Sequence, residues 1–258
     1  MKKDVKQAIA AAFLSPAILA GLVARGEAEN TADLQRLLIS QQCVSCDLAG
    51  VVLAGTRLAG ANLTEANLQA ANLQEVVLIN SNLQAANLTG ANLQAATLTR
   101  AVLIDTTLID TDLTGASLSY ANLTGATLRG ADLTATIAPE ANFTDADLTA
   151  ATLTRAVFTQ ASFTGANLSE ADLQAAELNR AYLLRVDLTN ADLRNANFSR
   201  ARFVRSNLNG ADLTDASLFS AQMNRTSLEG TIFCRTIMPD GTQNDDNCTP
   251  EPSAHISD

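Results

Sequence analysis

The chain has 258 residues, with 27 acidic and 17 basic side chains, so its formal net charge at pH 7 is −10. Its single histidine, His255, lies close to the C-terminus. Nucleophilic catalysis by a Ser–His or Cys–His pair needs a histidine held on an ordered scaffold. The sequence also lacks a glycine-rich phosphate-binding loop. Composition therefore predicts that the protein is not an enzyme and uses no cofactor.

The first 28 residues have the composition of a secretory signal peptide. Residues 8–24 are nearly all apolar, and Gly26-Glu27-Ala28 places small residues where a signal peptidase cleaves. We expect cleavage after Ala28, and export of the chain. The apolar run is short for a membrane span, so none is expected in the mature chain. The alternative is an N-terminal helix that covers one end of the protein. The segment starts with three basic residues: Lys2, Lys3 and Lys6.

A short helix is predicted from Thr31 to Gln42, within an N-terminal cap that spans residues 29–46. Three leucines lie at helical spacing, and Thr31 can cap the start of the helix. The leucines are Leu34, Leu37 and Leu38.

From Leu48 to Phe233, every fifth residue is a leucine or a close substitute. Of these 38 positions, 30 are Leu, six are Phe, and the other two are Met223 and Ala138. The residue two positions earlier is Ala at 26 of the 38 positions, so the repeating phrase is A-[N/D]-L-x-x. A helix repeats its apolar positions every 3.6 residues and a strand every two. A period of five predicts a solenoid whose chain turns a corner in every repeat.

This phrase resembles that of the pentapeptide repeat proteins, as in residues 61–65 and 211–215. The resemblance covers residues 47–233. It implies an all-β fold, a right-handed quadrilateral parallel β-helix with about four repeats per coil. At ~4.8 Å between coils, the solenoid would be roughly 45 Å long.

With four repeats per coil, every twentieth residue falls in one vertical column. The interior phenylalanines then occupy only two of the four columns, close to the exceptional Ala138 and the following Pro139. We consider two interpretations equally: aromatic rings fill the volume that Ala138 leaves, or the chain forms a local bulge there.

Four cysteines lie at the two ends of the repeat, and four thiols permit three pairings. Because the ends of a long rod are far apart, we favour Cys43 with Cys46 and Cys234 with Cys248. Residues 238–241, Met-Pro-Asp-Gly, have a turn signature, so residues 234–249 are expected to form a disulfide-linked C-terminal cap. Residues 250–258 are expected to be a flexible tail. An even cysteine count together with a signal peptide indicates an oxidising compartment.

A metal site is not expected. Cys43 and Cys46 have the spacing of half a zinc site or of a redox pair, but 13 residues separate the other two cysteines and His255 lies in the tail. The many Asp and Asn residues are periodic, which is typical of a solvated face or of side chains that support corners.

Two surface features are candidate contacts for a protein partner. Branched apolar residues stand at outward positions where the repeat normally has Asn, Thr or Gln, and they are Val77, Ile79, Val102, Ile104 and Ile109. One column becomes basic near the C-terminus, at Arg185, Arg205 and Arg225. Solvated charge remains the alternative interpretation of that column.

The combined pattern predicts a non-catalytic structural or protein-interaction rod. It is similar to pentapeptide repeat proteins of the cyanobacterial periplasm and the thylakoid lumen, so we expect one of these compartments. The alternative is a DNA mimic that acts on DNA gyrase or topoisomerase, as some relatives do. The export signal, the basic C-terminal third and the lack of a C-terminal dimerisation helix oppose it. We therefore expect an unidentified protein partner, no nucleic acid, and a monomer rather than a dimer.

Overall fold

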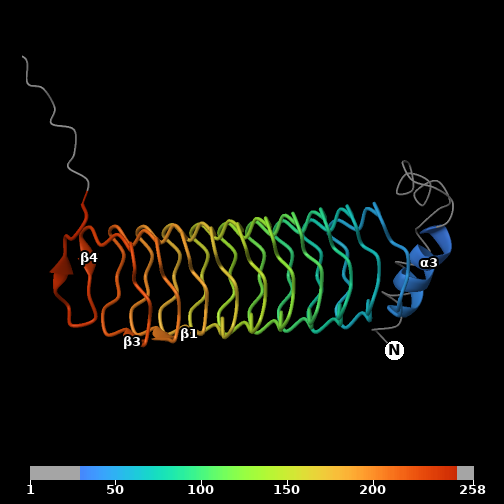
Figure 1. Ribbon diagram of the computed structural model, residues 1–258. Coiled ribbons are helices and arrows are strands. Elements are labelled where there is room, and N and C mark those ends of the chain that lie inside the picture. Colours follow the sequence, from blue (N-terminus) through green and yellow to red (C-terminus); the bar gives the residue numbers. More distant parts are fainter. Residues whose placement is uncertain (1–29, 249–258) are drawn as a thin grey trace, which may run out of the picture.

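The computed structural model describes residues 30–248, which form a rod with a helix at its N-terminal end and a hairpin at the other (Figure 1). The predicted signal peptide and tail lie outside the described residues. The helix is α3 (Asn30–Ser40). The strands are β1 (Tyr182–Leu184), β2 (Arg202–Val204), β3 (Gln222–Asn224), β4 (Thr236–Ile237) and β5 (Gln243–Asn244).

The chain is a right-handed β-helix that rises by one coil every 20 residues. Parallel bridges join each residue before an inward centre to its equivalent one coil later, from Gln42 with Asn62 to Ser217 with Ile237. The Leu63 N–H donates to the Asn82 carbonyl oxygen (2.7 Å) in a typical coil contact. Four repeats therefore make one coil, as the resemblance implied.

Each corner is a four-residue turn whose third residue has a positive φ. In residues 58–61, the Ala61 N–H donates to the Leu58 carbonyl oxygen (3.0 Å), and φ of Gly60 is 76°. A positive φ at this position is the signature of a type II turn. Most corners carry a residue other than glycine there, such as Glu65 (φ 57°), although left-handed backbone costs such residues about 1–2 kcal/mol.

Hydrogen bonds to the next coil and to side chains support these corners. The Glu65 N–H donates to the Gln84 carbonyl oxygen of the following coil (2.8 Å). The Asn62 side chain accepts from the Thr64 N–H (3.2 Å), and Asn or Asp repeats this bond in many coils. The periodic Asn and Asp residues thus stabilise the turns, because they compete successfully for backbone N–H groups.

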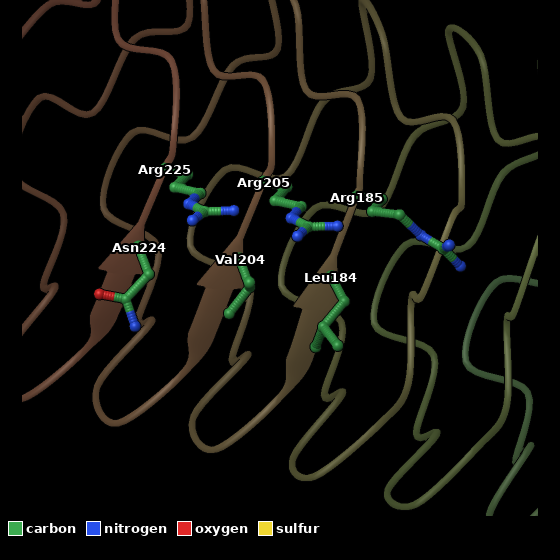
Figure 2. Close-up of a pocket in the computed structure, with 6 residues that line it drawn as sticks. All are labelled: Leu184, Arg185, Val204, Arg205, Asn224 and Arg225. Carbon is green, nitrogen blue, oxygen red and sulfur yellow. The ribbon is translucent and has the colours of Figure 1, made fainter.

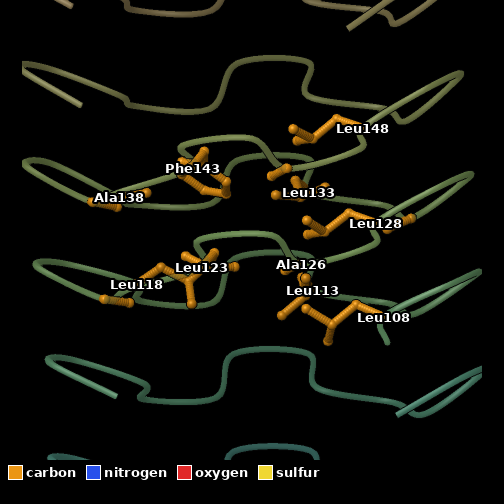
Figure 3. Packing of buried hydrophobic residues seen from close by; sticks show 14 of the residues in the cluster. Leu108, Leu113, Leu118, Leu123, Ala126, Leu128, Leu133, Ala138, Phe143 and Leu148 are labelled. Atoms are coloured by element: carbon orange, nitrogen blue, oxygen red, sulfur yellow. The ribbon is translucent and has the colours of Figure 1, made fainter. Parts of the chain in front are cut away.

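The leucine and phenylalanine centres and the alanines two residues before them fill the interior (Figure 3). Ala138 is fully buried, and its N–H donates to the Val157 carbonyl oxygen (2.8 Å). The bridges at Ile137 join it to Ser117 and to Val157 without a break. The suggestion of a bulge at Ala138 is therefore wrong, because the coil register passes through this repeat unchanged.

Helix α3 lies across the N-terminal end of the rod, and its Leu34 and Leu37 side chains are buried in the same core (Figure 1). It ends two residues earlier than predicted, since Gln41 has a positive φ (56°) and Gln42 already forms the first bridge. Cys43 occupies an inward position of the first coil and is bonded to Cys46, the pairing favoured from sequence.

The C-terminal end carries the antiparallel hairpin of β4 and β5. Its turn has the expected Met-Pro-Asp-Gly sequence, and the Gly241 N–H donates to the Met238 carbonyl oxygen (2.9 Å). The Cys234–Cys248 disulfide links the segment before β4 to the segment after β5. The two disulfides therefore lie at opposite ends of the rod, as the sequence favours.

Candidate interaction surface

One side of the rod contains β1, β2 and β3, and we call it the strand face. In each coil it starts at a corner residue such as Arg180 and ends at the next corner, Arg185. The bridges repeat this segment every 20 residues, with Tyr182 beside Arg202 and Arg202 beside Gln222. We call the column of Arg180 the leading corner and the column of Arg185 the trailing corner.

Three arginines follow one another at the trailing corner of the strand face. Arg185, Arg205 and Arg225 are exposed, and Figure 2 shows them extending from successive coils in the same direction along the rod. Their stems, together with Leu184, Val204 and Asn224, line a shallow cavity of about 440 Å³. We call these three residues the arginine ladder.

No carboxylate between residues 30 and 248 forms an ion pair with the arginine ladder. Coils stack at ~4.8 Å, so three like charges lie close together on a surface with apolar atoms beside them. Such a cluster attracts carboxylate or phosphate groups, for which the planar guanidinium is well suited.

Tyr182 and Arg202 extend this surface, and sequence reasoning did not single them out. The Arg202 guanidinium lies over the Tyr182 ring, 5.9 Å from its centroid, which is a cation–π contact. Tyr182 is 43 % exposed. The sequence signal for Tyr182 is its position, because an aromatic residue stands there where half of the repeats have Asn or Asp.

The five apolar residues predicted to form a contact patch are all half-buried. The register distributes them over three successive sides of the rod: Val77 and Ile79 on one, Val102 and Ile104 on the strand face, and Ile109 on the next. The structure thus brings only Val102 and Ile104 together on the face of the arginine ladder.

The side opposite the strand face carries a column of aspartates. They are Asp112, Asp132, Asp172, Asp192 and Asp212. Burial by itself would raise the pKa of Asp192, but hydrogen bonds and charge from Arg194, together with the Gln174 amide, lower it overall. Burial likewise opposes the hydrogen bonds of Asp112, whose donors Thr114 and Gln94 nevertheless lower its pKa.

These carboxylates do not gather into a metal-binding group. Among the residues that the structure describes, no cluster of three or more His, Cys, Asp or Glu side chains is arranged to hold a metal ion. Over the same part of the chain, no helix combines the length and the apolar character needed to cross a membrane.

Comparison with known families identifies the repeat. A model described as pentapeptide repeats (8 copies) matches residues 42–78 and 96–134. A second, described as a pentapeptide repeat region, matches residues 156–233. Together with the 20-residue coil, these matches place the solenoid in a known class. The chain belongs to the pentapeptide repeat family.

Several solved structures are similar to this chain. HetL, a pentapeptide repeat protein involved in heterocyst differentiation regulation from the cyanobacterium Nostoc sp. strain PCC 7120, is 29 % identical over 82 % of this chain and 97 % of its own, with a TM-score of 0.48. A pentapeptide repeat protein from the Arabidopsis thaliana thylakoid lumen is 35 % identical over 42 % of this chain and 66 % of its own, with a TM-score of 0.21.

QnrB1, a plasmid-mediated fluoroquinolone resistance protein, is 16 % identical in a trypsin-treated form, over 70 % of this chain and 91 % of its own, with a TM-score of 0.39. A comparison with curated protein sequences found no match.

Proposed function

We propose that the chain is a non-catalytic rod that binds a protein partner through its strand face, in an oxidising compartment outside the cytoplasm. The observation that carries this proposal is the arginine ladder. Three exposed guanidinium groups lie in successive coils with no ion pair in the described chain, beside the apolar side chains of Leu184 and Val204.

The ladder is better suited to a partner than to solvent alone. Parallel arginines at ~4.8 Å spacing repel one another, and an acidic surface that neutralises them relieves this repulsion. Arg is enriched at the centres of protein interfaces because it combines charge with an apolar stem. Since the backbone below is hydrogen-bonded from coil to coil, binding orders only the arginine side chains and not the backbone that carries them.

The cysteines support a compartment outside the cytoplasm. Four cysteines are bonded in two pairs, one at each end of the rod, and such bonds persist in oxidising compartments such as the periplasm or the thylakoid lumen. Edman or mass-spectrometric analysis of the native protein should find an N-terminus at Glu29. An intact Met1 in a cytosolic fraction contradicts export.

Partner binding is tested by affinity capture from the native compartment with wild-type chain and with the double variant Arg185→Glu, Arg205→Glu. We expect a partner that the double variant retains at least about tenfold less well, since like charges then face its acidic groups. Arg155→Glu is the matched control, because Arg155 is an exposed corner residue with a similar positive φ (58°) on another side of the rod. Equal capture of the partner by the wild type, the double variant and the control contradicts the proposal.

The competing function is DNA mimicry directed at gyrase. The positive ladder on the strand face disfavours it, because a duplex mimic presents negative charge along its length. Inhibition of gyrase supercoiling by the purified chain at low concentration would favour the mimic over the interaction rod.

A further inference from the structure

Both corners of the strand face change sign along the rod, and they do so at the same coil. Reading toward the C-terminus, the trailing corner carries Asp105, Gly125, Asp145, Gly165, Arg185, Arg205 and Arg225. The leading corner carries Arg100, Tyr120, Glu140, Gln160, Arg180, Arg200 and Ser220. The coil of residues 160–165, with Gln160 and Gly165 at its corners, separates Asp105, Glu140 and Asp145 from the arginines that follow, and Arg100 is the one basic residue of these corners on its N-terminal side.

The charged groups at these corners are exposed and lack opposite charges of their own. In the described chain, no ion pair involves Asp105, Asp145, Glu140 or Arg180. Glu140 only accepts a hydrogen bond from the Tyr120 hydroxyl (3.2 Å). Between the two corners, over residues 100–225, the strand face carries one charge, that of Arg202.

A two-fold axis through the coil of residues 160–165 would make this face complementary to itself. If two rods lie antiparallel with strand faces together, Asp145 meets the partner's Arg185 and Asp105 meets the partner's Arg225. At the other corner, Glu140 meets the partner's Arg180. By symmetry each pair occurs twice, as in every isologous interface, so six ion pairs form.

The remaining contacts across this axis bring no like charges together. Arg205 meets the partner's Gly125, Arg202 meets the partner's Asn122, and Arg200 meets the partner's Tyr120. Leu184 and Val204 meet threonines, the partner's Thr144 and the partner's Thr124. On the axis itself Gly165 meets its own copy, where the missing side chain permits close approach.

No other position of the axis gives six ion pairs at the two corners without bringing like charges together. Moving the axis one coil toward the N-terminus places Asp145 on its own copy and Arg100 on the partner's Arg180. Moving it one coil the other way places Arg180 and Arg185 on their own copies. A parallel arrangement about an axis along the rod brings leading corners onto trailing corners, so Glu140 meets the partner's Asp145 and Arg180 meets the partner's Arg185.

The Asp145 and Arg185 side chains also point in directions that suit an ion pair across this axis. An added Cβ on Gly165 would collide with the Asp145 Oδ1 atom, so the Asp145 carboxylate lies over the coil of the axis. Figure 2 shows Arg185 extending toward the coil that precedes it in the chain, which is the same coil. In the antiparallel pair, both groups therefore reach toward the same point.

We propose that two copies of this chain associate antiparallel through their strand faces, about a two-fold axis at the coil of residues 160–165. The inference rests on the proposed function and names the partner of the arginine ladder as a second copy. Seven coils overlap, which at ~4.8 Å per coil gives a contact roughly 30 Å long. It departs from the sequence-based expectation of a monomer.

The test is sedimentation equilibrium of the full chain, purified with its disulfides formed, together with two charge-reversal variants. Asp145→Arg and Arg185→Asp should each raise the dimer dissociation constant by about 100-fold, because each places two like-charged pairs in the interface. An equimolar mixture of the two variants restores opposite charges at both symmetric positions. We expect it to form a heterodimer that neither variant forms with itself.

Two controls accompany this experiment. Circular dichroism should show that both variants keep the fold, and Arg155→Asp, on another side of the rod, should dimerise like the wild type.

A wild-type chain that sediments as a monomer at every concentration overturns the proposal. So does a dimer that neither variant weakens, or a mixture that fails to recover. If the monomeric chain still captures a different protein that the Arg185→Glu, Arg205→Glu variant loses, the dimer fails and the proposed function stands. If the chain dimerises as described but captures no other protein, the arginine ladder serves self-association alone.

Discussion

The rings of Phe143 and Phe163 stack one coil apart in the core, with centroids 4.9 Å apart and planes inclined by 6°. Phe158, in the neighbouring column, meets both rings edge-on. Ala138 precedes Phe143 by one repeat in the same coil and has the same full burial (Figure 3). The aromatic cluster thus lies where the one small centre would otherwise leave the interior underfilled.

We predict that Phe143 and Ala138 are energetically coupled. Phe143→Leu should destabilise the fold through the cavity it leaves, and Ala138→Leu should cost about 1–3 kcal/mol through overpacking. Combining Phe143→Leu with Ala138→Leu should recover part of both losses, by an interaction energy of about 0.5–3 kcal/mol. A double-mutant cycle by urea unfolding measures this, and strict additivity would show that the rings do not compensate for Ala138.

Leucine centres should tolerate no charge. Leu128 is fully buried, and Leu128→Ala should cost about 2–5 kcal/mol. Leu128→Asp should cost more, because its carboxylate has no partner in the core. Thr127→Asp, one residue away at a position where the repeat commonly has Asp, is the control and should change stability little. Hydrogen exchange in the coils of residues 108 and 148 should rise only in the Leu128 variants.

The two disulfides should stabilise the ends of the rod. The Cys234–Cys248 bond spans 14 residues, and replacing both cysteines with serine should cost about 3 kcal/mol in the chain-entropy account. In a solenoid this loss stays local, because each coil contacts only its neighbours. Reduction should therefore speed hydrogen exchange in residues 213–248 and in α3 before it affects the middle coils, whereas uniform loosening contradicts this account.

Acid should destabilise the rod. The Arg235 hydrogen bonds and charge lower the pKa of Asp215, and the pKa values of Asp112 and Asp192 are lowered as well. A carboxylate with a lowered folded-state pKa contributes stability above its unfolded value, and that contribution is lost as pH falls through the folded pKa. We expect a constant melting temperature from about pH 5 to pH 8 and a fall below about pH 4. Asp215→Asn should flatten part of that fall, and an unchanged slope would exclude the Arg235 pair as a contributor.

Sequence alone determined the inward positions, the corners and the ends of the repeat. A period of five places the same side chains inward in every repeat, so the burial of Leu128 and Phe163 follows from position. The pairing of Cys43 with Cys46 was favoured because a rod keeps its ends apart.

Tertiary structure decided which residues are neighbours from coil to coil. Closure of four corners into one 20-residue coil sets that relationship, and it depends on hydrogen bonds such as that of the Leu63 N–H with Asn82. For this reason the apolar residues Val77 and Ile109 fall on different sides although they stand at outward positions in the same part of the sequence. For the same reason Asp145 and Arg185, 40 positions apart in sequence, lie on one corner at equal distances from Gly165, a symmetry that exists only once the coils are stacked.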